Sequence, residues 1–234
     1  MKNTILLNIA LILILFLFNP AETGASPLSS RLENFPHWDS KPLLNQAKGD
    51  LVYPEWLAGN WQVTSILVAQ YAPLAPHIVT PGFTDNEAYL DVPVLFPVKF
   101  VPQSSAAREI IADREFNGLA IATAYLGKDK VKSVKVDPSN PNRQITWLSN
   151  KRQLITTVTG RGKDNSTPAK FIASELSQQI FRSDKSIYLN EVETTTEYQR
   201  KNPDLITAEQ ITAIYLSPQD PAYFQAQEQP VALY

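Results

Sequence analysis

The sequence of 234 residues contains no cysteine and only two histidines. The absence of cysteine excludes disulfide bonds, thiol catalysis, cysteine-ligated zinc or iron–sulfur sites, and a lipid-modified cysteine. A mechanism that depends on histidine would have to use His37 or His77. Without disulfides the fold must be stabilised by its core, which a chain of this length can supply.

The sequence also lacks a large excess of charge of either sign. It contains 21 Lys and Arg against 23 Asp and Glu, a formal net charge of −2. The chain as a whole therefore has no basic field that would attract nucleic acid or an anionic membrane. Its 44% apolar and 19% charged residues are typical of a globular protein.

The first 25 residues have the order of parts of a secretory signal. Lys2 precedes an apolar run over Ile5–Phe18, and the small residues Thr23-Gly24-Ala25 follow. This order is typical of a signal peptide, and the run is shorter than the ~20 residues that span a bilayer. We therefore expect residues 1–25 to be cleaved and the mature protein to be exported. The alternative is an uncleaved membrane anchor.

Residues 26–52 show no lasting period of either helix or strand. We expect them to form an extended lead-in segment that lies across the domain. Phe35 and Trp38 are the side chains expected to hold it there by packing.

Residues 53–234 are expected to form one mainly β domain. Its alternating and β-branched segments predict about eight to ten strands, mostly joined locally. A short helix is expected over Leu119–Leu126, ended by Gly127, and a polar loop over Arg161–Pro168. Arg108–Arg114 is compatible with a strand, and the alternative is a short helix capped by Ser104 or Ser105 that runs through Phe116. Sequential antiparallel strands lose their exposed edges by closure, so we predict an antiparallel up-and-down barrel.

The string Leu57-Ala58-Gly59-Asn60-Trp61 resembles the opening of calycin barrels, the lipocalins and fatty-acid-binding proteins. In those families a Gly-x-Trp lies on the first strand, and its Trp closes one end of the barrel. The resemblance implies this role for Trp61 and a lipocalin-like barrel for the domain. An Arg of a late strand often packs over that Trp, and no such Arg is evident after Arg200.

Three further strings, Trp56–Ser65, Tyr71–Pro76 and Asp113–Leu119, resemble an uncharacterised exported family of cyanobacteria and plastids. Plant members of that family are associated with the thylakoid lumen. The resemblance implies a location in the thylakoid lumen or the periplasm, and it implies no activity.

Four side chains are the candidates for holding a small apolar ligand such as a pigment, a quinone or a lipid: Trp61, Trp147, Arg114 and Asn117. Sites of this kind are apolar with a few polar anchors. The two Trp would line a cavity, and the two polar residues would lie at its mouth. The structural alternative places both Trp in the core and makes Asp113–Asn117 an ion-paired turn in which Asn117 caps the helix.

The sequence offers no catalytic residue that we would name. His77 lies in a Pro-rich loop, and neither histidine is near a Gly-x-Ser-x-Gly nucleophile motif. Glu191 and Glu193 share one strand face, which fits acid–base catalysis but is more common on a solvated face. The segment Gly160–Lys163 lacks the Ser or Thr of a phosphate-binding loop. No metal ligand or cofactor is identified.

The sequence thus predicts a non-catalytic protein of the thylakoid lumen or periplasm that binds a small apolar ligand or a photosynthetic membrane complex. Ligand binding predicts a cavity lined by apolar and aromatic side chains, whereas partner binding predicts an exposed apolar patch. The alternative is an enzyme that modifies a lipid or carotenoid with a buried carboxylate. Neither nucleic acid binding nor a stable membrane span after signal cleavage is expected.

Overall fold

The computed structural model describes residues 27–104 and 108–234. Strands account for 49% of the residues and helices for 16%, so the fold is mainly β, as predicted, and its sheets are antiparallel. The predicted signal peptide, residues 1–25, lies outside the described part of the chain. Among the helices that the structure describes, none is both long and apolar enough to cross a membrane.

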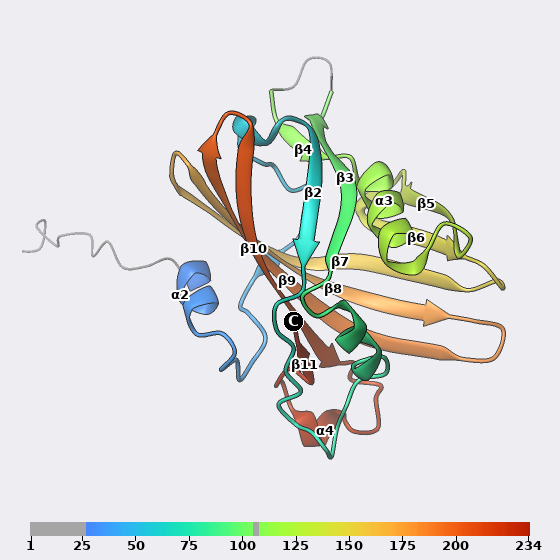
Figure 1. Cartoon of the computed structure of the whole chain (residues 1–234). Coiled ribbons are helices and arrows are strands. Elements are labelled where there is room, and N and C mark those ends of the chain that lie inside the picture. The colour runs from blue at the N-terminus through green and yellow to red at the C-terminus, as the bar shows by residue number, and fades with distance from the viewer. Residues whose placement is uncertain (1–26, 105–107) are drawn as a thin grey trace, which may run out of the picture.

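The larger of two sheets contains eight strands and extends across the molecule in Figure 1. Its order is β11-β10-β9-β8-β7-β6-β5, and β1 pairs with β7 beyond the end of β6. The strands are β1 (Asn45–Gln46), β5 (Val131–Asp137), β6 (Asn140–Leu148), β7 (Gln153–Thr167), β8 (Lys170–Arg182), β9 (Ile187–Asn202), β10 (Leu205–Leu216) and β11 (Ala232–Leu233). Because β5 to β10 are neighbours in both sequence and space, short hairpins build this sheet.

The smaller sheet has three strands, β2 (Gly59–Ile66), β3 (Pro93–Pro102) and β4 (Ile110–Ala112), with β3 in the middle. The helices are α2 (Pro27–Glu33), α3 (Arg114–Leu126) and α4 (Tyr223–Ala226), with 3-10 turns η1 (Glu55–Leu57) and η2 (Thr84–Tyr89). The expectation of one short helix is therefore wrong, although α3 ends at Gly127 as predicted. Of the two alternatives for this stretch, the strand expected within Arg108–Arg114 holds for the three residues of β4.

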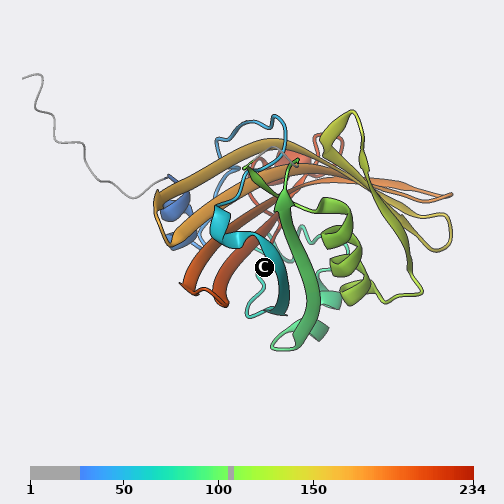
Figure 2. The ribbon, with the colours of Figure 1, turned by 90° about the horizontal axis from the view of Figure 1, so that it is seen from above.

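Figure 2 shows the large sheet curving over β2, β3 and α3. Helix α3 packs against β3 on one side and against β5 on the other. In the barrel that we predicted, strand pairing would join the small sheet to β5. In the structure α3 lies between them instead. No closed barrel is found in the described ranges, because β2 to β4 form a sheet of their own.

Helix α3 begins five residues earlier than predicted, because Asp113 caps it. The Asp113 carboxylate accepts a hydrogen bond from the Phe116 backbone N–H at 3.1 Å. Asn117 therefore does not cap the helix. Its side chain instead accepts a hydrogen bond from the Lys99 N–H at 2.7 Å and donates one to the Lys99 carbonyl at 2.9 Å. The Asn117 amide thus supplies hydrogen-bond partners for the backbone N–H and carbonyl of Lys99, next to Phe100, where the pairing of β3 with β4 ends.

The lead-in segment covers the face of the large sheet that points away from the small sheet. Phe35 and Trp38 pack there with Ile211 and Ala213 of β10, which confirms their predicted role. The segment is not simply extended, since it contains α2.

Two glycines of β7 make room for this segment. A Cβ on Gly160 would lie 3.1 Å from Leu44 Cβ, and a Cβ on Gly162 would lie 3.0 Å from Leu44 Cδ2. Their strand continues to Thr167, so the loop predicted over Arg161–Pro168 is wrong. Pairing with β8 and the cover by Leu44 outweigh the low strand propensity of glycine.

Candidate functional site

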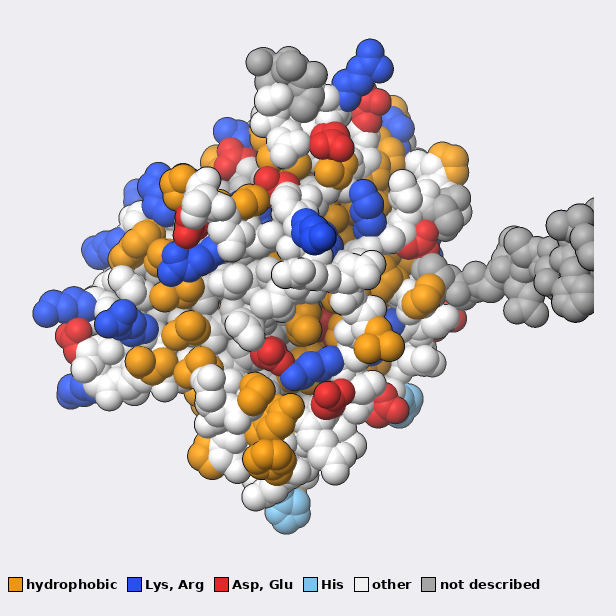
Figure 3. Space-filling model, turned by 180° about the vertical axis from the view of Figure 1, so that it is seen from behind, with side chains coloured by type: hydrophobic (Ala, Val, Ile, Leu, Met, Phe, Trp, Pro, Cys, Tyr) orange, Lys and Arg blue, Asp and Glu red, His pale blue; other side chains and the backbone are white. Residues whose placement is uncertain are grey.

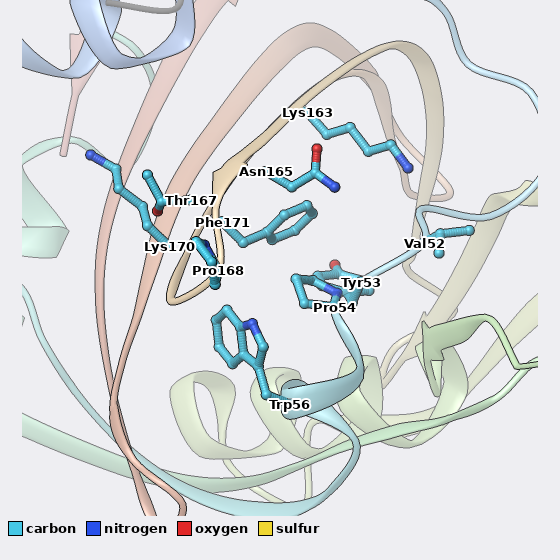
Figure 4. Close-up of a pocket in the computed structure, with 10 residues that line it drawn as sticks. All are labelled: Val52, Tyr53, Pro54, Trp56, Lys163, Asn165, Thr167, Pro168, Lys170 and Phe171. Carbon is cyan, nitrogen blue, oxygen red and sulfur yellow. The ribbon is translucent and has the colours of Figure 1, made fainter.

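A hollow with a volume of about 250 Å³ opens between the end of the lead-in segment and the turn of the β7–β8 hairpin. Figure 4 shows the side chains around it. They are Val52, Tyr53, Pro54, Trp56, Lys163, Asn165, Thr167, Pro168, Lys170 and Phe171. Residues that are more than 100 positions apart in the sequence therefore form its two walls.

Three aromatic rings, those of Tyr53, Trp56 and Phe171, form part of the apolar lining. The ring centroid of Tyr53 lies 4.7 Å from that of Phe100 and 5.6 Å from that of Phe171, at steep interplanar angles that favour aromatic contact. Trp56 extends from η1 toward Pro168 across the hollow (Figure 4). These rings give the hollow a rigid apolar surface that is open on one side.

The turn η1 that carries Trp56 is itself held in place by its neighbours. Leu57 is buried in the core between the sheets, with Phe100 and Phe171. The indole N–H of Trp61 donates a hydrogen bond to the Leu57 carbonyl at 2.8 Å. Trp61 thus supports the wall of the hollow from behind rather than lining it.

Two lysines lie at the rim, and only one of them is paired. The Nζ of Lys170 lies 2.7 Å from a carboxylate oxygen of Glu197. Lys163 has no ion pair with any residue in the described ranges. The rim therefore offers one ammonium group that is not neutralised, next to an aromatic surface.

A cluster of charges lies beside Tyr53, on the concave side of the large sheet. Oε1 of Glu175 on β8 accepts hydrogen bonds from Arg161 at 2.6 and 2.8 Å and from Arg114 at 3.1 Å. Arg114 also lies 3.3 Å from Asp50 of the lead-in segment. Arg161 further donates to Asn142 of β6 at 2.7 Å. The cluster thereby joins three strands of the large sheet to α3 and to the lead-in segment.

The pKa shifts in this region follow from burial and from these charges. Burial, followed by Tyr198 and Glu175, raises the pKa of Tyr53 well above its ordinary value. Burial raises the pKa of Tyr198 to about 12. Burial acts to lower the pKa of Arg114, but Glu175, Tyr53 and Asp50 outweigh it and raise the pKa. Near neutral pH the phenols are thus hydrogen-bond donors and not bases.

A second Arg–Glu cluster lies on the convex face, beneath the lead-in segment. Glu193 is fully buried there and accepts hydrogen bonds from Arg31 at 2.5 and 2.6 Å and from the Tyr215 hydroxyl at 2.8 Å. The neighbouring Glu191 pairs with Lys41. The expectation of a solvated face for these two glutamates is wrong, because the lead-in segment covers them.

The structure separates the four predicted ligand residues. Arg114 belongs to the charged cluster beside the hollow, and Trp61 supports η1. Asn117 is engaged with the backbone of β3. Trp147 lies on β6, three positions after Gln144, and the side chain of Gln144 faces α3. Because side chains alternate between the two faces along a strand, Trp147 lies on the face that points away from α3. A role of these four in ligand binding stays a prediction.

Sequence reasoning missed Tyr53, Glu175 and Arg161. Glu175 could have been found as the single charge on the face of β8 that also carries Phe171 and Ala173, whereas Arg161 shares its face of β7 with Lys163. His77 is exposed in its loop, and the described residues contain no group of three or more His, Asp or Glu that could hold a metal ion.

The comparisons with known proteins give a family but no activity. A family model described as a domain of unknown function (DUF6816) matches residues 45–234, most of the chain. No curated protein and no solved structure shows a significant match.

Proposed function

Because the chain belongs to the DUF6816 family, whose description names no activity, we propose a function from the geometry: a non-catalytic protein that binds a small apolar ligand in the hollow beside Tyr53, Trp56 and Phe171. The observation that carries the proposal is the aromatic hollow with an unpaired Lys163 at its rim. Apolar sites with a few polar anchors are typical of such ligands.

The size of the hollow limits what it takes. About 250 Å³ is below the 300–1,000 Å³ of common small-molecule pockets, so one ring or one chain end fits inside it. Among a pigment, a quinone and a lipid, a quinone head group suits this space best. Its ring would stack on Trp56, and one carbonyl oxygen would accept a hydrogen bond from the Lys163 ammonium group.

The nearby carboxylates support binding rather than catalysis. Oε1 of Glu175 already accepts three hydrogen bonds from Arg114 and Arg161. Glu193 is closed off beneath the lead-in segment. An enzyme that modifies a lipid or carotenoid would need an inward-facing carboxylate that is free to exchange a proton with its substrate.

The proposed location is the thylakoid lumen or the periplasm. The signal-like order of residues 1–25 supports export.

The test is equilibrium binding of a short-chain plastoquinone analogue to the full mature chain, measured by calorimetry. Trp56→Leu removes the stacking ring and is expected to weaken binding about tenfold. The matched control is Trp147→Leu, which lies on the other face of β6 and should leave binding unchanged. Equal affinities of the two variants, or no binding by the unmutated chain, would overturn the proposal.

A second candidate is a protein partner that docks on the outer face of the paired strands β2 and β3. Ile66 and Leu95 are exposed on this face, to 47% and 61%, and Val68 just beyond β2 is exposed to 77%. Exposed apolar patches of this kind often mark protein interfaces. Co-purification with a photosynthetic membrane complex that is lost in Leu95→Lys would favour this function. A monomer recovered alone from gentle lysates would contradict it.

A further inference from the structure

One end of the large sheet is strongly basic, although the chain carries a formal net charge of −2. The loop before β5, the β6–β7 turn and the β8–β9 turn lie at this end. These segments and the strand ends that adjoin them contain seven exposed basic residues and two acidic ones, Asp129 and Asp184. The basic residues are Lys128, Lys130, Lys132, Lys151, Arg152, Arg182 and Lys185. We call this surface the basic end.

Strand pairing brings these segments together. Val131 of β5 pairs with Leu148, Gln153 pairs with Arg182, and Arg182 pairs with Ile187. The backbone N–H of Ser149 also donates to the Lys130 carbonyl at 2.8 Å, which joins the first two loops. The ends of five neighbouring strands, β5 to β9, therefore lie side by side, together with the charges that they and their turns carry. Figure 3 shows blue side chains gathered at the left of the view, over these strand ends.

The charges of the basic end are largely unneutralised. Within the described ranges, the one ion pair that involves any of the seven basic residues joins Lys151 to Asp184 at 3.9 Å, and both partners are exposed. Such exposed pairs contribute little. A polar dent of about 440 Å³ lies between Lys151, Gln153 and Arg182, with Ser183 and Asp184 at its edge. Two cations, Lys151 and Arg182, and one carboxylate, Asp184, thus surround a space of head-group size.

Apolar side chains lie among these charges. Phe181 is 38% exposed, Ile187 is 61% exposed, and Leu126 at the end of α3 is 43% exposed. The ring of Phe181 packs against Tyr188 with centroids 6.0 Å apart, so it is held at the surface. A solvated basic patch has no need of exposed apolar groups, whereas a surface that inserts at a bilayer interface uses both.

We propose that the basic end is a docking surface for an anionic lipid bilayer. The Lys and Arg side chains attract the acidic head groups, and Ile187 and Phe181 enter the interface between head groups and chains. The polar dent accommodates one head-group phosphate or sulfonate. This inference does not depend on the aromatic hollow, which lies at the opposite ends of β7 and β8. A protein bound in this way would hold the mouth of that hollow away from the membrane.

The first test is co-sedimentation of the full mature chain with phosphatidylglycerol vesicles and with phosphatidylcholine vesicles. Binding to the anionic vesicles alone, weakening as salt is raised, is expected. The variant Lys151→Glu/Arg152→Glu/Arg182→Glu should reduce the partition coefficient at least about 100-fold, because each basic residue near the surface contributes about fivefold. The control Lys48→Glu/Arg108→Glu/Lys201→Glu changes the charge equally outside the basic end and should bind anionic vesicles normally.

The second test separates a membrane from other polyanions. Ile187→Ser removes one apolar side chain from the basic end, and Leu205→Ser does the same at the opposite end of β9–β10; both residues are exposed first residues of strands. Loss of vesicle binding in Ile187→Ser alone supports the proposal. If the unmutated chain does not bind anionic vesicles, or binds heparin equally well with no effect of Ile187→Ser, the proposal is overturned. Displacement from vesicles by inorganic phosphate alone would likewise overturn it.

Discussion

The two faces of the large sheet each carry an Arg–Glu cluster, and the two clusters differ in their access to solvent. On the convex face, Arg31 and Glu193 are sealed under the lead-in segment, and the Glu193 side chain is 0% exposed. On the concave face, Glu175 is 23% exposed and lies near an open hollow. The chemistry of the two pairs is the same, and the difference lies in what covers them.

This difference separates a structural role from a candidate functional one. The guanidinium of Arg31 is further fixed over the ring of Trp38, 3.8 Å from its centroid. The convex cluster therefore fastens the lead-in segment and leaves no space for a ligand. The concave cluster instead positions the segment that carries Tyr53 and Trp56, so it shapes the hollow from behind. The predictions below test this distinction.

The largest effect is expected from breaking the sealed cluster. Arg31→Met leaves the Glu193 carboxylate buried without its cation, which should lower the free energy of unfolding by about 3–5 kcal/mol. Urea denaturation measures this loss. The double variant Arg31→Met/Glu193→Leu removes both charges and should regain most of the stability. If the single variant were as stable as the unmutated protein, the convex cluster would not be what holds the lead-in segment on the sheet.

Alkaline pH is expected to have the next largest effect, and it acts through the phenols. The folded-state pKa of Tyr198 is about 12, against an ordinary value of 10.0. The folded state therefore keeps its proton while the unfolded state loses it, so stability that is fully present below pH 10 is lost as pH rises toward 12. For Tyr198 this loss is about 2–3 kcal/mol. The free energy of unfolding, measured across this pH range, should fall less steeply in Tyr198→Phe than in the unmutated protein. Identical slopes of the free energy of unfolding against pH would contradict the raised pKa of Tyr198.

Removing an Arg from the concave cluster should lower the free energy of unfolding less than removing one from the convex cluster. In Arg114→Met, Glu175 keeps Arg161 as a partner and remains in contact with solvent. We expect a loss of about 2 kcal/mol in the free energy of unfolding, together with weaker ligand binding because Tyr53 is no longer held. The matched control Arg143→Met breaks a more solvent-accessible pair with Asp137 and should change the stability by less than about 1 kcal/mol. A loss in Arg114→Met as large as in Arg31→Met would remove the distinction between the faces.

The same contrast shows what the sequence could and could not predict. The succession of locally joined antiparallel strands and the helix end at Gly127 depend on local signals, and both were predicted correctly. The covering of Glu193 depends on Arg31, which is 162 residues away, and no local signal reports it. A strand pattern shows which residues share a face, but not which segment packs over that face.

The basic end is a second feature that the sequence alone did not predict. A net charge of −2 excluded a basic field for the whole chain, and this remains correct for the average. Strand pairing nevertheless collects Lys130, Lys151 and Arg182 at one end of the sheet. Composition reports the sum of the charges, whereas the fold decides where they lie.

The smallest effect is expected from crowding the lead-in segment without touching either cluster. In Gly160→Ala the new Cβ would lie 3.1 Å from Leu44 Cβ, close enough to push the segment outward by a few tenths of an ångström. We expect a loss of about 1 kcal/mol in the free energy of unfolding, since overpacking is usually mild when one side can move. Ligand binding should stay unchanged, because Gly160 faces away from the concave cluster; if binding weakened as well, the two faces of the sheet would be coupled through β7.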